Sequence, residues 1–223
     1  MKKKLMYLCM LVCTMGVFNS CSDDDESKDD LVGTWNLNPV AMDMTWESSE
    51  EISINGILMN TSAVATLAAQ YGNTSLPEKL KSITFRDNNK LEATYLDGGT
   101  EKTDVYGTFR VVNGSKLNFT PDVDKLLEGV EGLNTEAIAA IKLLTAPGIP
   151  VYYTLAADGT SGRFYLDTKT IKEIKSLLPI LGASLSGDDA STVMIKGILE
   201  QMPGILDKTD KIELGLNFNK ATN

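Results

Sequence analysis

Apolar and polar residues alternate along most of the chain from residue 31 onward. The last segment shows this most clearly, because Ile212, Leu214, Leu216 and Phe218 are separated by polar or small residues. A period of two predicts strands with one buried face and one wet face, which is typical of an antiparallel sheet. The segments with this pattern are 34–37, 51–55, 82–85, 91–95, 105–111, 117–119, 151–155, 164–166 and 212–219.

Turn sequences separate several of these segments. Asp87-Asn88-Asn89, Asn113-Gly114 and Asp158-Gly159 each stand between two alternating runs. Asn, Asp and Gly tolerate the positive φ that tight hairpins need. We therefore expect a four-stranded meander over 83–120 and a hairpin over 151–166. The predicted inner face of the third meander strand consists of Val105, Gly107, Phe109 and Val111.

Helical periodicity appears between the strands. Apolar residues recur at threes and fours over 121–144, 171–181 and 194–202, and more weakly over 58–71. We expect the third of these helices to end near Pro203, because proline disrupts a helix interior. None is apolar enough to span a membrane, so their apolar stripes are expected to face the core.

The N-terminus has the layout of a lipoprotein signal peptide. Three lysines precede the apolar run Leu5–Phe18, and Asn19-Ser20 then precede Cys21. This resembles the lipoprotein signals of Bacteroidetes, which implies lipid attachment at Cys21. The alternative is ordinary cleavage with an incidental cysteine. The other two cysteines lie inside the apolar run and would be removed, so the mature chain has no disulfide.

An acidic run follows directly. Asp23, Asp24, Asp25 and Glu26 form either a solvated spacer or an export tag, since such a run resembles the signal that sends Bacteroidetes lipoproteins to the cell surface. We expect a signal peptide over 1–20, a disordered acidic tether over 21–30 and one domain over 31–223. The expected location is the outer membrane facing the cell surface, with the periplasmic face as the alternative.

The first strand carries a resemblance to a known fold. Gly33-Thr34-Trp35 is similar to the Gly-x-Trp signature that opens lipocalins and related barrels, and 31–120 resembles the lipocalin-like domains of Bacteroidetes lipoproteins. The resemblance implies a mainly β protein with a closed or curled antiparallel barrel of about 8–10 strands. The three or four helices predicted between the strands exceed the usual lipocalin complement, and we expect them to cover the barrel. The alternative is an α+β fold. It also implies that Trp35 is buried against the last strand near Leu214 and Leu216.

One part of the lipocalin pattern is missing. That pattern places an arginine late in the chain against the tryptophan, whereas the arginines here, Arg86, Arg110 and Arg163, all precede the last strand. The second tryptophan, Trp46, lies nearer a turn, and we expect it to contribute less to stability than Trp35.

Composition narrows the function. The 223 residues include no histidine, which excludes His-based catalysis and His-ligated metals, and the net charge of −9 argues against a nucleic-acid partner. We expect a monomeric, non-enzymatic lipoprotein without metal or cofactor, holding a small apolar or amphipathic ligand inside the barrel. Candidate pocket-lining residues are Phe85, Tyr95, Phe109, Tyr153 and Phe164, which instead fill a solid core in the alternative interpretation.

Two other functions remain open. An accessory glycan-binding protein would use exposed aromatic residues, for which the candidates are Trp46, Tyr71, Tyr106, Tyr152 and Tyr165. A hydrolase would need a carboxylate pair, and no spacing among the 30 acidic residues selects one. The methionines Met42, Met44 and Met59 are interpreted as core residues rather than ligands of a soft metal.

Overall fold

Strands close into a barrel in this protein. The computed structural model describes residues 26–54, 56–128, 133–184 and 190–222. The barrel strands are β1 (Gly33–Ser48), β4 (Leu80–Phe85), β5 (Lys90–Asp97), β6 (Thr100–Asn113), β7 (Lys116–Pro121), β8 (Ile149–Leu155), β9 (Ser161–Leu166) and β10 (Thr209–Lys220). All neighbours are antiparallel, in the order β1-β10-β9-β8-β7-β6-β5-β4, and β4 returns to β1. This confirms the mainly β barrel class and the meander and hairpin within it.

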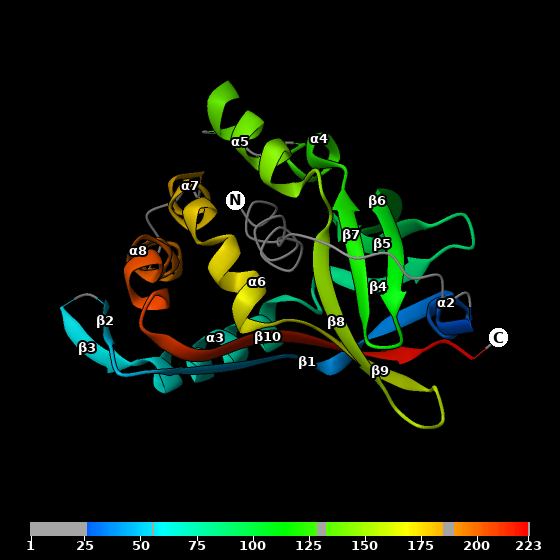
Figure 1. The fold of residues 1–223 in the computed structure, drawn as a ribbon, viewed down its shortest axis with the longest axis horizontal. Coiled ribbons are helices and arrows are strands. Elements are labelled where there is room, and N and C mark those ends of the chain that lie inside the picture. The colour runs from blue at the N-terminus through cyan, green and yellow to red at the C-terminus, as the bar shows by residue number, and fades with distance from the viewer. Residues whose placement is uncertain (1–25, 55, 129–132, 185–189, 223) are drawn as a thin grey trace.

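The first and last strands are longer than the barrel needs. A bulge interrupts their pairing: Leu37 pairs with Phe218, and the next pair is Met42 with Leu216, so β1 has more residues than β10 between the two pairs. Beyond the bulge, β1 is no longer paired with β4, and the paired β1 and β10 continue as a ribbon to the pair Ser48–Thr209. Strand β9 stays paired with β10 only as far as Leu214. Figure 1 shows β1 and β10 running side by side away from the barrel.

Helices gather around this ribbon rather than around the barrel wall. The ribbon is accompanied by α3 (Thr61–Ser75), α6 (Thr168–Glu173), α7 (Leu178–Ser184) and α8 (Ala190–Leu206), with a 3-10 turn at 175–177 before α7 (Figure 1). A small hairpin, β2 (Glu51–Ile54) and β3 (Ile57–Asn60), packs on α8. Two further helices, α4 (Val123–Leu126) and α5 (Thr135–Thr145), lie after the end of β7, within and just beyond the segment 121–144 that was predicted to be helical.

Two predicted helix boundaries are wrong. The weak helix expected from residue 58 begins only at Thr61, because Leu58 belongs to β3 and the Asn60 side chain caps the helix by accepting from the Ala63 N–H. The helix expected to end near Pro203 continues to Leu206, which is fully buried. Burial of the residues after the proline outweighs the lost helical hydrogen bond.

A bulge in β6 shifts the predicted inner face. Leu91 pairs with Gly107 but Glu92 pairs with Val105, so Tyr106 is an extra residue on β6. Beyond the bulge the alternation changes phase. Tyr106 is therefore buried and Val105 is exposed, the opposite of the sequence-based expectation.

One end of the barrel is closed by helix α2 (Glu26–Leu31) and by Trp35. The Trp35 side chain is fully buried and its indole N–H donates to the Leu31 carbonyl at 2.7 Å. The helix shows that residues 26–30 are not part of a disordered tether; Leu31 is buried, and Lys28 donates to the Asp87 carbonyl, so the segment is docked.

Trp35 contacts the last strand, but not where expected. Trp35 stands opposite Lys220, while Leu214 and Leu216 lie farther along, opposite Met44 and Met42. The Lys220 ammonium lies 5.3 Å from the Trp35 ring centroid and donates to the Asp30 carbonyl. Gly33 has a φ of +128° and leaves room for the Lys220 side chain. A lysine thus supplies the cation that the lipocalin pattern assigns to an arginine.

Candidate functional site

The barrel encloses a cavity next to its closed end. This barrel cavity has a volume of about 120 Å³, roughly ten times what one water needs. Its walls come from seven of the barrel strands, from β4 round to β10, and from the chain ends of α3 and α4. Lining residues include Leu80, Phe85, Leu117, Phe119, Leu126, Val151, Phe164 and Leu214. The lining is almost entirely hydrocarbon, and such cavities are not stable sites for water.

Aromatic side chains fill the rest of the barrel. We call this cluster the aromatic plug; it consists of Trp35, Phe85, Phe109, Tyr153, Phe164 and Phe218. Phe164 lies at its centre, with ring centroids 5.4 Å from Phe85, 5.6 Å from Trp35 and 5.8 Å from Phe218. The edge-to-face and stacked contacts make this end of the barrel a packed core.

The five predicted pocket residues are all buried, but only four of them lie in these two regions, and Tyr95 lies in neither. Phe85 and Phe164 line the barrel cavity as well as belonging to the plug. Phe109 and Tyr153 belong to the plug alone, and the Tyr153 hydroxyl donates to the Asn113 carbonyl. Tyr95 packs on Tyr106 and donates to Asp104 at 2.6 Å. The barrel is therefore partly solid and partly hollow.

A second cavity lies outside the barrel, between the ribbon and the helices. This annex cavity has a volume of about 170 Å³. Met42, Met44 and Trp46 of β1 form one wall with the inner face of β10. The other walls are apolar side chains of the helices α3, α6 and α8, among them Val64, Ala68, Ile171, Ile174, Met194, Ile198 and Met202. Leu76, Leu214 and Leu216 line both cavities and form their common boundary.

The annex cavity was missed by the sequence interpretation. The apolar stripes at 171–181 and 194–202 correctly indicated buried helix faces, but periodicity does not show whether such faces meet closely. A usable signal was the run of methionines, since Met42 and Met44 line the annex cavity rather than filling the barrel core. Within the described ranges, no three acidic, Cys or His side chains cluster closely enough to hold a metal ion.

The predicted exposed aromatics occupy different environments. Trp46 is buried, with its indole N–H donating to the Thr209 hydroxyl at 2.9 Å, and Tyr106 is buried too. The sequence-based placement of both at the surface is wrong, because the ribbon is covered by helices and β6 carries its bulge. Tyr71 is partly exposed and lines the annex cavity.

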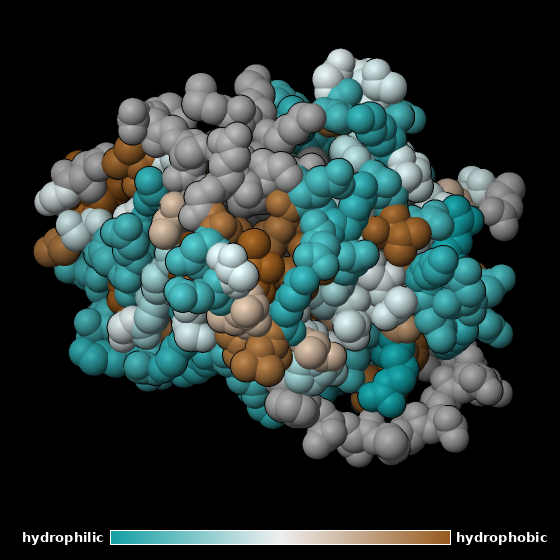
Figure 2. All heavy atoms as spheres, turned by 90° about the horizontal axis from the view of Figure 1, so that it is seen from above, coloured by the Kyte–Doolittle hydropathy of each residue, from teal (hydrophilic) through white to brown (hydrophobic). Residues whose placement is uncertain are grey.

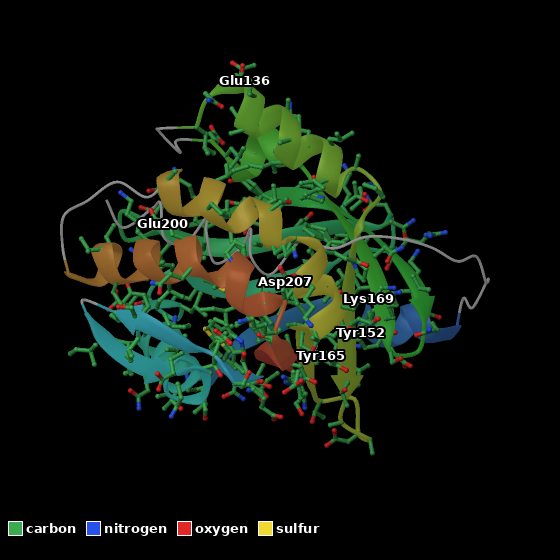
Figure 3. The ribbon with its side chains drawn as sticks, turned by 60° about the vertical axis from the view of Figure 1, so that its left-hand side comes forward. Glu136, Tyr152, Tyr165, Lys169, Glu200 and Asp207 are labelled. Atoms are coloured by element: carbon green, nitrogen blue, oxygen red, sulfur yellow. The ribbon has the colours of Figure 1, made fainter. Side chains whose placement is uncertain are left out.

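Tyr152 and Tyr165 do lie on the outer wall of the barrel, side by side on β8 and β9 (Figure 3). Their ring centroids are 5.7 Å apart, Lys116 lies 5.5 Å from the Tyr152 ring and Arg163 lies 4.4 Å from the Tyr165 ring. Each ring thus already has another ring and a cation against it. This arrangement leaves less open aromatic surface for stacking a sugar than two free rings would offer.

Arg163 joins this wall to β1. Its Nε donates to Asp43 at 3.0 Å, and Asn217 donates to the same carboxylate at 2.9 Å. Burial by itself would raise the pKa of Asp43, but these hydrogen bonds and the Arg163 charge outweigh burial and hold the pKa below its ordinary value. Asp43 is therefore a structural anion at neutral pH.

The described carboxyl groups whose pKa departs from its ordinary value are stabilised as anions. Hydrogen bonds hold the pKa of Asp43, Asp104 and Asp158 below the ordinary value of an aspartate. Glu136 lies on α5, Glu200 on α8 and Asp207 in the turn after α8, and the three side chains do not point toward one another (Figure 3). A general acid would need the opposite, a carboxyl group whose pKa is raised.

Seen from above, apolar residues gather in the middle of the molecule and are bordered by hydrophilic surface (Figure 2).

No helix in the described part of the chain is both long and apolar enough to cross a membrane. Cys21 and Asp23–Asp25 lie outside the described residues, and of the acidic run only the backbone of Glu26 falls within them, at the start of α2.

Comparison with known proteins adds no relative to this description: no family model, no characterised protein and no solved structure matches the chain.

Proposed function

We propose that this protein is a membrane-anchored binding protein that holds a small apolar or amphipathic ligand in its barrel. The observation that carries the proposal is the barrel cavity, whose lining is almost wholly hydrocarbon. An eight-stranded barrel has an interior just wide enough for side chains or for one small ligand. Here the aromatic plug takes the first role at one end, and the cavity is available for the second.

The chemistry of the lining restricts the ligand. Among the described residues that line the barrel cavity, none is charged and only two are tyrosines, Tyr106 and Tyr165. The Tyr165 ring lies on the outer wall, so Tyr106 has the one side-chain oxygen of this described lining on the inner side. A charged group inside would lose its hydration without gaining a partner, which costs several kcal/mol or more. The enclosed part of the ligand is therefore apolar, and any polar end stays at the solvent.

A cavity-filling substitution tests this proposal. Ala93 lines the barrel cavity, so Ala93→Leu should occupy part of the space and weaken binding of the apolar fluorescent probe 1-aminoanthracene by about tenfold or more. A fluorescence titration measures the affinity. Thr94→Leu, one residue along β5, is the matched control, because Thr94 faces outward toward Thr103. Absence of saturable binding to the unmodified protein would contradict the proposal, as would equal affinities for Ala93→Leu and the unmodified protein.

We propose further that Cys21 carries the lipid that anchors the chain. Its position after the apolar run supports this proposal. Cys21→Ala should move the protein from washed membranes to the soluble fraction without changing its melting temperature, because the barrel contacts described above begin at α2. Immunoblotting of the two fractions measures the shift. Retention of the variant in membranes at the unmodified level would refute lipid anchoring at this cysteine.

The acidic run after Cys21 is proposed as the signal for the outer face of the outer membrane.

The alternative functions have weaker support. Glycan stacking would use Tyr152 and Tyr165, whose rings already contact each other and two cations. A carboxylate-based hydrolase lacks a described carboxyl group with a raised pKa.

A further inference from the structure

The barrel cavity and the annex cavity meet at three residues. Leu76 of the segment after α3, and Leu214 and Leu216 of β10, line both. The annex cavity is the larger of the two, at about 170 Å³ against about 120 Å³. Its described lining carries no charged side chain either. The structure therefore places two hydrocarbon-lined spaces end to end.

One face of β10 forms a floor that runs through both spaces. Phe218, Leu216, Leu214 and Ile212 are successive inward-facing residues on this strand. Inside the barrel, three of these residues pair with β9. The pairs are Phe218 with Gly162, Leu216 with Phe164 and Leu214 with Leu166. On its other side, the same strand pairs Leu216 and Leu214 with Met42 and Met44 of the ribbon. The apolar row thus passes from barrel to annex without a polar interruption.

The aromatic plug sets the direction in which a ligand can extend. Phe164 has contacts with four other rings of the plug, so a chain in the barrel cavity cannot continue toward Trp35. In the other direction the cavity is bounded by Leu216 and Leu214, which also line the annex cavity. There Met42, Met44, Met194 and Met202 line the walls, and methionine side chains adapt their shape to a flexible ligand.

We propose that the two cavities form one binding tunnel for a single elongated, flexible hydrocarbon chain of the fatty-acyl class. This inference rests on the proposed function. The floor from Phe218 to Ile212 extends about 20 Å at the usual rise of a strand. An extended hydrocarbon chain advances about 1.3 Å per carbon, so a chain of roughly 16 carbons covers the tunnel. A compact rigid ligand would occupy one cavity, and its affinity would not depend on the other cavity.

Filling the annex alone distinguishes a tunnel from a barrel-only site. Ala68 of α3 lines the annex cavity but not the barrel cavity, so Ala68→Phe should block the far half of the tunnel. Ala69→Phe is the matched control, because Ala69 is equally half-exposed on the same helix and lines neither cavity. Displacement of 1-aminoanthracene by fatty acids of 10, 12, 14 and 16 carbons then gives an affinity for each chain length.

The tunnel predicts a dependence on length that the annex variant removes. The unmodified protein should bind the 16-carbon chain at least about tenfold more tightly than the 10-carbon chain, because each buried methylene adds affinity. Ala68→Phe should reduce this ratio to about threefold or less and leave the affinity for the 10-carbon chain unchanged, while Ala69→Phe keeps the full ratio. If Ala68→Phe does not fold, Ala68→Leu serves in its place.

Two outcomes would overturn the inference. The tunnel is wrong if the annex variant keeps the full length dependence, or if the unmodified protein binds all four chains equally. In both cases the proposed function still stands, since the barrel cavity binds the chains. If the unmodified protein binds neither the probe nor any chain, the proposed function fails together with the tunnel.

Discussion

Replacing Trp35 with alanine should lower the free energy of unfolding by about 3–5 kcal/mol, a large part of the roughly 5–15 kcal/mol that stabilises a domain. The indole is fully buried and packs edge-to-face on Phe164. Its removal leaves a cavity in the aromatic plug, takes a hydrogen-bond donor from the Leu31 carbonyl and removes the ring under Lys220. Urea unfolding followed by circular dichroism measures the change.

Two comparison variants sharpen this result. Trp46→Ala should lower the free energy of unfolding by a similar amount, because Trp46 is 1% exposed and hydrogen-bonded to Thr209. The sequence, which places Trp46 near a turn, predicted a smaller loss of stability, but this buried environment does not support that prediction. Val40→Ala, at a side chain 67% exposed, should change stability by no more than about 0.5 kcal/mol. A cost below about 1 kcal/mol for Trp35→Ala would contradict its place in the plug.

A second large loss is expected for Gly107→Ala, of about 3 kcal/mol or more. A Cβ on Gly107 would lie 2.2 Å from the Thr120 carbonyl oxygen and 2.9 Å from the Pro121 Cα. Both atoms belong to the backbone, so neither a rotamer change nor a side-chain shift relieves the clash. The φ of +156° also belongs to a region that residues with side chains rarely adopt. The strands β6 and β7 would have to separate.

Gly114→Ala is the matched control for this experiment. Gly114 lies in the turn between the same two strands, and a Cβ there meets no atom within 4 Å. We expect it to change the melting temperature little, whereas Gly107→Ala should lower it by many degrees. Equal melting temperatures for the two variants would show that β6 and β7 do not approach as described.

Local patterns predicted the barrel strands well because each strand has only one buried face. The row from Ile212 to Phe218 and the hairpin turn at Asp158-Gly159 were both recognised from short-range signals. The bulge that places Tyr106 inside was not recognised, because the extra residue shifts the register of β6 and leaves no distinct residue type in the sequence to mark it. Register depends on pairing with β5, which a single strand's pattern does not contain.

The site was harder to predict than the fold. The aromatic residues chosen as pocket lining are all buried, yet alternation alone does not distinguish a plug residue such as Tyr153 from a cavity residue such as Phe85. The role of Lys220 depends on the meeting of the first and last strands, which are far apart in the sequence. The annex depends on how several helices meet the ribbon, and apart from the methionines Met42 and Met44 this long-range packing leaves no local signal.

The central claim is that the barrel interior receives an apolar ligand. The most direct measurement is a crystal structure of the protein with 12-bromododecanoic acid, in which anomalous scattering locates the bromine atom. The account predicts a bromine peak within the cavities, in contact with apolar residues such as Leu117 in the barrel or Met44 in the annex. A signal confined to the outer surface, with the barrel interior unoccupied at a saturating ligand concentration, would contradict it.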